Sequence, residues 1–89
     1  MEAEYDFIVN PRARSGMGDM IWRMLEPELK KRRIIYRVHM TQRRGHAEKI
    51  AGTLTSDGSR RTLVVLGGDG TINEVVNGIC FPKRATLGY

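Results

Sequence analysis

The glycine-rich segment Gly67-Gly68-Asp69-Gly70-Thr71 is the part of the sequence best suited to chemistry. It follows a run of apolar branched residues and precedes apolar residues at helical spacing, so it lies where a strand passes into a helix. Glycines allow a ligand to approach the backbone closely, and amides at a helix N-terminus attract anions. The alternative is a tight turn with a good helix cap. The buried strand and the helix on either side favour a site for a di- or triphosphate.

The segment fits neither of the two common nucleotide-binding motifs. A P-loop needs a lysine directly after its last glycine, and no lysine follows Gly70 before Lys83. The dinucleotide motif would need a third glycine where Asn73 stands. Cations for a bound phosphate must therefore come from elsewhere, and the candidates are Arg12, Arg14, Arg43 and Arg44.

The histidines and the single cysteine are weaker candidates for chemistry. His46 could contact phosphate, but its place in the first turn of an expected helix favours packing or solvation. His39 lies on an expected strand, where we predict a structural role. Cys80 is expected to be a small buried residue, and a single cysteine excludes an internal disulfide. No cysteine and histidine cluster has the spacing of a metal site.

The elements that position these residues alternate along the chain. We expect strands over 5–9, 34–40, 62–66 and 85–89, and helices over 19–31, 46–54 and 72–79. The uniformly apolar strand before Gly67 predicts a central position, buried on both faces. This order predicts an α/β fold, a three-layer, doubly wound and mostly parallel sheet.

Several local signals set the expected ends of the helices. Asp19 is the predicted N-cap of the first helix, and Pro27 predicts a kink or a break near Leu25 and Glu26. Thr71 and Glu74 have the spacing of a capping box, which would start the third helix. Its apolar stripe would be Ile72, Val75, Val76 and Ile79, and Asn77 with Gly78 would form its C-cap.

Composition limits the chain to one small domain. The 89 residues are 40% hydrophobic and 28% charged, which argues against disorder. Fifteen Lys and Arg against ten Asp and Glu give a net charge of +5, and eleven of the cations are arginine. Such a charge suits nucleotides, nucleic acid or an anionic lipid surface. The acidic start lacks the features of a signal peptide, so we expect a cytoplasmic protein.

Three segments together resemble the diacylglycerol kinase catalytic domain family, which includes bacterial lipid kinases and sphingosine and ceramide kinases. The run from Gly67 to Gly78, GGDGTINEVVNG, is similar to the family signature. Asn10-Pro11 with Ser15-Gly16 resembles the family's first nucleotide loop, and Thr41 with Gly45-His46-Ala47 resembles the segment after its second strand. NAD kinases and phosphofructokinases share the Gly-Gly-Asp-Gly loop, but the residues after it resemble the lipid kinases.

The resemblance implies transfer of the ATP γ-phosphate to the hydroxyl of a diacylglycerol-type or sphingoid-type lipid, with Mg²⁺. Carried over by position, Asn10 and Thr41 would contact the nucleotide. The residues that would wrap its phosphates are Gly68, Asp69, Gly70, Thr71, Ile72, Asn73 and Glu74. Asp69 is the only carboxylate in the loop, so it either organises magnesium or water or simply fixes the turn.

Members of this family continue with a further glycine-rich segment and a second, mostly β domain that supplies the lipid pocket and the general base. We therefore expect residues 1–89 to be the N-terminal ATP-binding part, inactive alone, which reaches its lipid at a membrane surface through the absent domain. The sheet edge would then be exposed. We expect loose packing or a homodimer through Phe81, Leu87, Tyr89 and the Met-rich first helix.

Two other functions are compatible with the sequence. One is a non-enzymatic basic module that binds nucleic acid, although the aromatic and basic interleaving of such modules is lacking, so we expect no nucleic-acid partner. The other is a kinase of the same superfamily that acts on a soluble acceptor such as NAD. A titration separates the first alternative from the kinase. The kinase should bind Mg-ATP selectively, whereas the binding of nucleic acid should fall steeply with salt.

Overall fold

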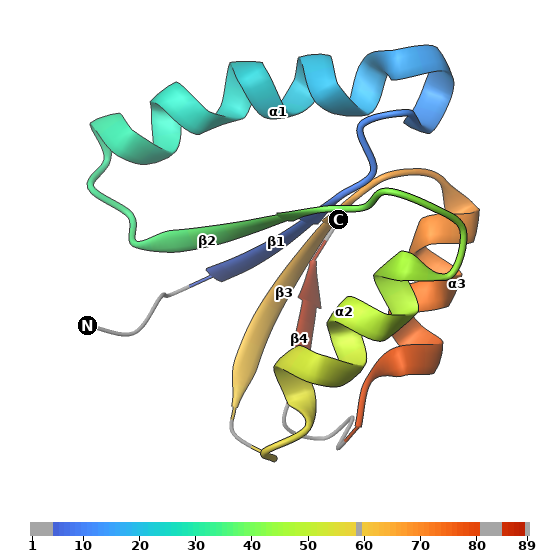
Figure 1. Cartoon of the computed structure of the whole chain (residues 1–89). Coiled ribbons are helices and arrows are strands. Elements are labelled where there is room, and N and C mark those ends of the chain that lie inside the picture. Colours follow the sequence, from blue (N-terminus) through green and yellow to red (C-terminus); the bar gives the residue numbers. More distant parts are fainter. Residues whose placement is uncertain (1–4, 59, 81–84, 89) are drawn as a thin grey trace.

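Four strands and three helices alternate along the chain in the computed structural model (Figure 1). The structure describes residues 5–58, 60–80 and 85–88. The elements are β1 (Tyr5–Val9), α1 (Ala13–Lys31), β2 (Tyr36–Met40), α2 (His46–Thr55), β3 (Arg61–Leu66), α3 (Asp69–Gly78) and β4 (Ala85–Gly88). Of the residues expected to mediate association, Phe81 and Tyr89 lie outside the described part of the chain.

The strands form one parallel sheet in the order β2-β1-β3-β4. In the register, Phe7 of β1 pairs with Val38 of β2 on one side and with Val64 of β3 on the other. Each crossover passes through a helix, as parallel pairing requires. Helix α1 covers one face of the sheet, and α2 and α3 cover the other (Figure 1). The expected three-layer, doubly wound fold is confirmed.

The core between α1 and the sheet is aromatic. Phe7 and Val9 point toward α1 and pack against Trp22 and Leu29. The ring centroids of Phe7 and Trp22 lie 5.2 Å apart, and Tyr36 meets Trp22 edge-on at 5.7 Å. The hydroxyl of Tyr36 donates a 2.6 Å hydrogen bond to Glu26 Oε2, which raises the pKa of Tyr36 to about 12. This bond links α1 to β2.

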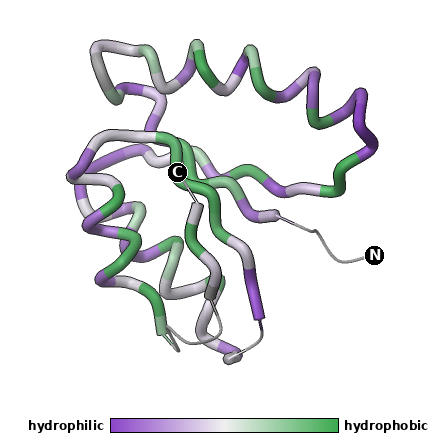
Figure 2. Tube along the Cα trace, turned by 180° about the vertical axis from the view of Figure 1, so that it is seen from behind, coloured by the Kyte–Doolittle hydropathy of each residue, from purple (hydrophilic) through white to green (hydrophobic). Residues whose placement is uncertain are grey.

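The core on the opposite face is aliphatic and contains small residues where the helices meet. Its buried members are Ile8, Ala47, Ala51, Leu63, Val65 and Val75. Ile8 comes from β1, and Leu63 and Val65 come from β3. These strands form part of the hydrophobic middle of the trace in Figure 2. A Cβ atom built on Gly78 would clash with the backbone carbonyl of Glu48, so α2 and α3 pack with their backbones close together. Gly78 therefore permits close packing, and the predicted C-cap is wrong because Ile79 caps α3.

Helix α1 begins six residues before the position that the sequence predicts. Ala13 is its first residue and Arg12 its N-cap, whereas Asp19 pairs with Arg23 at 3.0 Å on the helix surface. The amide of Ala13 donates to the carbonyl of Asn10, which starts the helix directly after the β1 loop. The glycine content of this stretch indicated a loop. Within the helix, Ser15 and Gly16 still have left-handed backbone, with φ of 58° and 94°.

Pro27 does not break α1, so this prediction is also wrong. The helix continues through Pro27 to Lys31. Pro27 lies on the exposed side of α1, and so does Arg23, whose carbonyl loses its usual donor. Solvent can satisfy that carbonyl, while Trp22 and Leu29 hold the other side of the helix on the sheet.

Three smaller predictions also differ from the structure. Strand β2 begins at Tyr36, not at Ile34. Val76 is 51% exposed and does not join the apolar stripe, because Thr71 and Val75 are the residues that α3 buries. Cys80 is exposed, just past the end of α3, where its amide donates to the hydroxyl of Thr55.

A buried carboxylate connects three strands near the amino-terminal end of the sheet. Asp6 of β1 is 2% exposed and accepts a 2.9 Å hydrogen bond from Arg37 Nε of β2. His39 Nε2 lies 3.2 Å from the same carboxylate, and Arg61 Nη1 of β3 lies at 3.5 Å. Burial raises the pKa of Asp6, but the hydrogen bonds from Arg37 and His39 outweigh it and hold the pKa below its ordinary value. The structural role expected for His39 is confirmed.

Replacing Asp6 should cost stability in a pH-dependent way. The folded-state pKa is lower than the unfolded one, so the contribution is present above pH 4 and is lost as the pH falls through the folded pKa. We expect Asp6→Asn to lower the free energy of unfolding by about 1–3 kcal/mol at pH 7, with a smaller difference near pH 3. Urea unfolding across this range measures it. Asp19→Asn, which removes an exposed ion pair, is the control and should change little. Equal effects of the two substitutions would contradict the prediction.

A pair of glycines tests the close packing of α2 and α3. Gly78→Ala must push the carbonyl of Glu48 away, whereas a Cβ on Gly52 comes no closer than 3.4 Å to Gly78 O. We expect Gly78→Ala to destabilise by about 1–3 kcal/mol and Gly52→Ala to be neutral or stabilising, because alanine favours a helix. Thermal melts followed by circular dichroism compare the two. A stable Gly78→Ala variant would refute the packing argument.

Candidate functional site

A cavity of about 350 Å³ lies at the carboxyl edge of the sheet. It is bordered by the loop after β1, the loop after β2 with the start of α2, and the first turns of α3. Its lining residues are Asn10, Arg12, Ala13, Thr41, Gln42, Arg43, Arg44, Ala47, Gly68, Gly70, Thr71 and Glu74.

The topology of the sheet explains why the cavity is here. Strand β1 lies between β2 and β3, and the chain leaves β1 toward one face but leaves β3 toward the other. The two connections diverge at this point, which opens a crevice beyond the strand ends. Open α/β sheets bind their ligands in this crevice.

Hydrogen bonds hold the three loops together at this edge. The amide of Asn10 donates to the carbonyl of Leu66 at 2.8 Å, and the amide of Thr41 donates to the carbonyl of Val9 at 2.8 Å. The side chain of Asn10 then connects the first loop to α3, because its Nδ2 donates to Thr71 Oγ1 at 3.2 Å. The loops that sequence analysis selected separately are therefore one connected structure.

The start of α3 differs from the predicted capping box. Gly68 is the N-cap, in extended backbone, and Thr71 lies inside the first turn. The carbonyl of Gly68 accepts the amides of Thr71 and Ile72. The hydroxyl of Thr71 is occupied as the acceptor for Asn10, so it does not cap the helix. Within the described part of the chain, the amides of Asp69 and Gly70 donate to no acceptor, and both are available to an anion.

The glycines of the loop divide into two kinds. A Cβ on Gly67 would lie 2.7 Å from Oγ1 of Thr71, so the fold itself requires a glycine there. A Cβ on Gly68 or on Gly70 would meet nothing within 4 Å, and neither residue has a positive φ. Both Gly68 and Gly70 line the cavity.

The cavity has an excess of positive charge. Arg12, Arg43 and Arg44 line it, against the single carboxylate of Glu74. All three arginines are exposed, so they can turn toward a ligand. His46 holds the arginine loop, because its Nδ1 accepts a 2.8 Å hydrogen bond from the amide of Gln42. Packing or solvation was expected for His46, and its ring instead accepts this backbone amide and does not line the cavity.

Six of the nine residues singled out from the sequence line this cavity. They are Asn10, Thr41, Gly68, Gly70, Thr71 and Glu74. Asp69 and Ile72 instead line a second cavity of about 190 Å³ between α3 and the start of α1, together with Gly18 and Ile21. Asn73 is exposed and lines neither of these two cavities.

Sequence reasoning missed Ala13, Gln42 and Ala47 as lining residues. Gln42 follows Thr41 directly, so its place in the same loop was a usable signal. Ala47 was named only in the segment Gly45-His46-Ala47 that resembles the family, with no role of its own. Its small side chain also lines the cavity at the start of α2, which the sequence pattern does not reveal.

Comparison with known proteins matches this arrangement. A model of the diacylglycerol kinase catalytic domain matches residues 4–89. YtlR of Bacillus subtilis, whose name assigns it to the lipid kinases, is 40% identical over 75 residues, which are 82% of this chain and 24% of YtlR. Sphingosine kinase 1 of Homo sapiens is 34% identical over 73 residues, which are 81% of this chain and 19% of that protein.

A solved structure agrees with these relatives. The crystal structure of a diacylglycerol kinase from Bacillus anthracis superposes with a TM-score of 0.70 at 29% identity, over 94% of this chain and 30% of that chain. The chain thus spans less than a third of the length of these three proteins. With a family model that matches nearly every residue, and the expected loops gathered at one edge, the chain belongs to the diacylglycerol kinase catalytic domain family.

Proposed function

We propose that this chain is the ATP-binding part of a lipid kinase that transfers the γ-phosphate of ATP to a lipid hydroxyl. The observation that carries the proposal is the cavity at the carboxyl edge, where two free amides of α3, two open glycines and three arginines converge. Each of these features favours a polyanion over a neutral ligand.

The triphosphate would lie along the first turn of α3. Gly68 and Gly70 let the phosphates approach the backbone, and the amides of Asp69 and Gly70 donate to them. Arg12, Arg43 and Arg44 take the place of the lysine that a P-loop would supply. Asn10 and Thr41 then contact the rest of the nucleotide from the loops after β1 and β2.

Magnesium would be held chiefly by the phosphates. Among residues 5–58, 60–80 and 85–88, no cluster of three or more His, Cys, Asp or Glu side chains could hold a metal ion. Magnesium does not need such a cluster, because it keeps several waters and uses one or two carboxylates with the substrate phosphates. Glu74, which lines the cavity, is the carboxylate that fits this role, whereas Asp69 lines the second cavity.

The acceptor class comes from the relatives. Their names specify lipid kinases, sphingosine kinase, sphingoid base kinases and ceramide kinases. All these acceptors are lipids with a free hydroxyl, which supports a diacylglycerol-type or sphingoid-type acceptor for the whole protein. A nucleic-acid module and a kinase for a soluble acceptor such as NAD stay as alternatives, and no observation favours either.

Two loop glycines separate nucleotide binding from folding. We expect Gly70→Val to weaken Mg-ATP binding by about tenfold or more without lowering the melting temperature, because its side chain enters the cavity and not the core. Gly67→Ala is the matched control and should lower the melting temperature, because its Cβ collides with Thr71. Calorimetric titration and thermal melts measure both quantities.

The results of these measurements distinguish a structural turn, a kinase site and a nucleic-acid module. A Gly70→Val variant that loses stability and affinity together would favour a structural turn. Binding of Mg-ATP that persists at moderate salt supports the kinase. Tight binding of oligonucleotides that disappears over the same salt range, with no selectivity for Mg-ATP, would instead favour the nucleic-acid module.

Phosphoryl transfer should need more protein than this chain. Transfer requires nucleotide, metal and acceptor to be positioned together, and the chain spans 24% of the length of YtlR. We expect the purified chain to bind Mg-ATP but not to phosphorylate diacylglycerol or sphingosine. A radiolabel assay tests this, with a Gly68→Val/Gly70→Val variant to exclude a contaminating kinase. Turnover that this variant abolishes would show that the chain is sufficient.

A further inference from the structure

Helix α1 carries a stripe of apolar side chains on the side that faces away from the sheet. Met17, Met20, Ile21 and Met24 are 46%, 59%, 39% and 71% exposed. Their spacing of three and four residues places them on one side of the helix. Trp22 and Leu29 fill the opposite side, so the core does not use the stripe.

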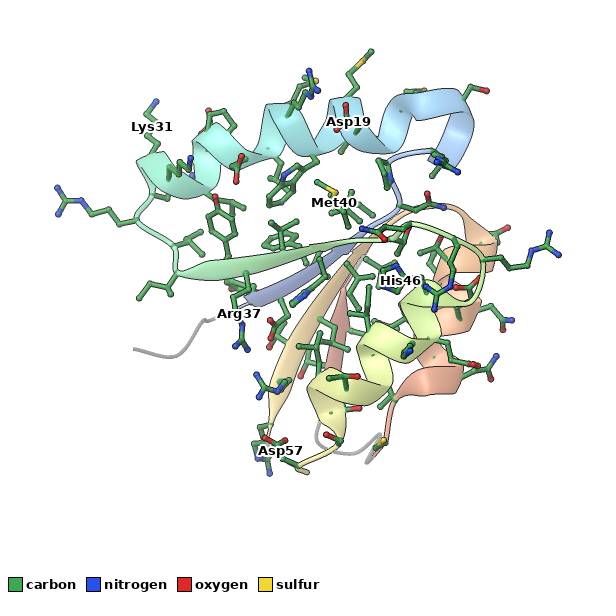
Figure 3. All side chains as sticks on the ribbon, in the orientation of Figure 1. Asp19, Lys31, Arg37, Met40, His46 and Asp57 are labelled. Carbon is green, nitrogen blue, oxygen red and sulfur yellow. The ribbon has the colours of Figure 1, made fainter. Side chains whose placement is uncertain are left out.

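The same helix ends in a cluster of cations. Lys30, Lys31, Arg32 and Arg33 are all exposed, and none forms an ion pair within the described part of the chain. Lys31 points away from the sheet in Figure 3, and Figure 2 shows a hydrophilic end of α1 beside its more hydrophobic middle. The exposed apolar stripe and the cation cluster therefore lie along one outward surface of α1.

We propose that this surface docks on an anionic lipid bilayer. Methionine and isoleucine side chains can enter the boundary between headgroups and acyl chains, while the adjacent lysines and arginines pair with anionic headgroups. The net charge of +5 favours the same partner. A second copy of the chain fits less well, because it would bring four more cations to the interface. No helix among the described residues is long and apolar enough to cross a bilayer, so α1 would lie on the surface.

The docked helix would bring the carboxyl edge of the sheet close to the lipid. Ala13, the first residue of α1, lines both cavities at that edge, and Ile21 of the stripe lines the second cavity beside Asp69. The inference goes beyond the proposed function, because vesicle binding requires neither a nucleotide nor a lipid acceptor. It also assigns membrane contact to residues of this chain rather than to a further domain.

Vesicle co-sedimentation of the 89-residue chain tests the proposal. We expect binding to phosphatidylcholine vesicles that contain phosphatidylserine, and little binding to phosphatidylcholine alone or at high salt. Lys30→Gln/Lys31→Gln should lower the partition coefficient by roughly tenfold at low salt, since two charges leave the surface. Met20→Gln/Met24→Gln should lower it to a similar degree.

Matched controls lie outside the proposed docking surface. Val76→Gln changes an apolar residue of α3 that is 51% exposed, and Lys49→Gln/Arg60→Gln removes two exposed cations, so both should leave vesicle binding unchanged. Melting curves of all variants should coincide with that of the parent chain, because every position is on the surface. Mg-ATP titration of the same variants reports separately on the proposed function.

Three results would overturn the proposal. The first is a parent chain that does not bind phosphatidylserine vesicles, and the second is an equal loss of binding in the controls. The third is a dimer in sedimentation equilibrium that Met20→Gln/Met24→Gln dissociates while vesicle binding stays the same. That last result would assign the stripe to a second copy of the chain.

Discussion

The central position of β1 is the constraint on which the rest of the structure depends. Its backbone pairs with β2 on one side and β3 on the other, and Asp6, Phe7, Ile8 and Val9 are all buried in consequence. Because the strands are parallel, the carboxyl end of β1 lies between those of its neighbours, and their loops must meet at one edge. Pairing with β3 brings Asn10 within reach of Thr71, and pairing with β2 places the loop that carries Thr41 on the other side of the cavity.

The structure distinguishes two kinds of glycine in this chain. Gly67 and Gly78 are needed because another part of the protein occupies the place of a Cβ atom, a side chain in one case and a backbone carbonyl in the other. Gly68 and Gly70 have free space around them and ordinary φ angles, so folding does not explain them. Under the proposed function, glycine at these two positions lets the phosphates reach the backbone of α3.

The cations are likewise distributed over separate environments. Arg37 and Arg61 compensate the buried carboxylate of Asp6, whose desolvation would otherwise be costly. Arg12, Arg43 and Arg44 line the cavity with little acidic compensation. The cluster from Lys30 to Arg33 projects from the end of α1 into solvent. The net charge of the chain therefore combines three groups of cations. One is structural, and the other two are available to anions.

By itself, the sequence determined the α/β order, the parallel sheet, the central place of the strand before Gly67 and most of the residues around the cavity. These follow from local patterns, such as apolar periodicity and a glycine-rich loop between a strand and a helix. Only the tertiary structure decided that α1 starts at Ala13, that Thr71 accepts from Asn10 and does not cap α3, and that Asp6 is an ionic centre. Asn10 and Thr71 are far apart in the sequence, and so are Asp6 and Arg37. The carbonyl of Asn10 that starts α1 belongs to a loop that the distant Leu66 holds in place. Local propensity cannot encode them, because the free energy of a hydrogen bond or a buried charge is set by the partner that the fold brings to it.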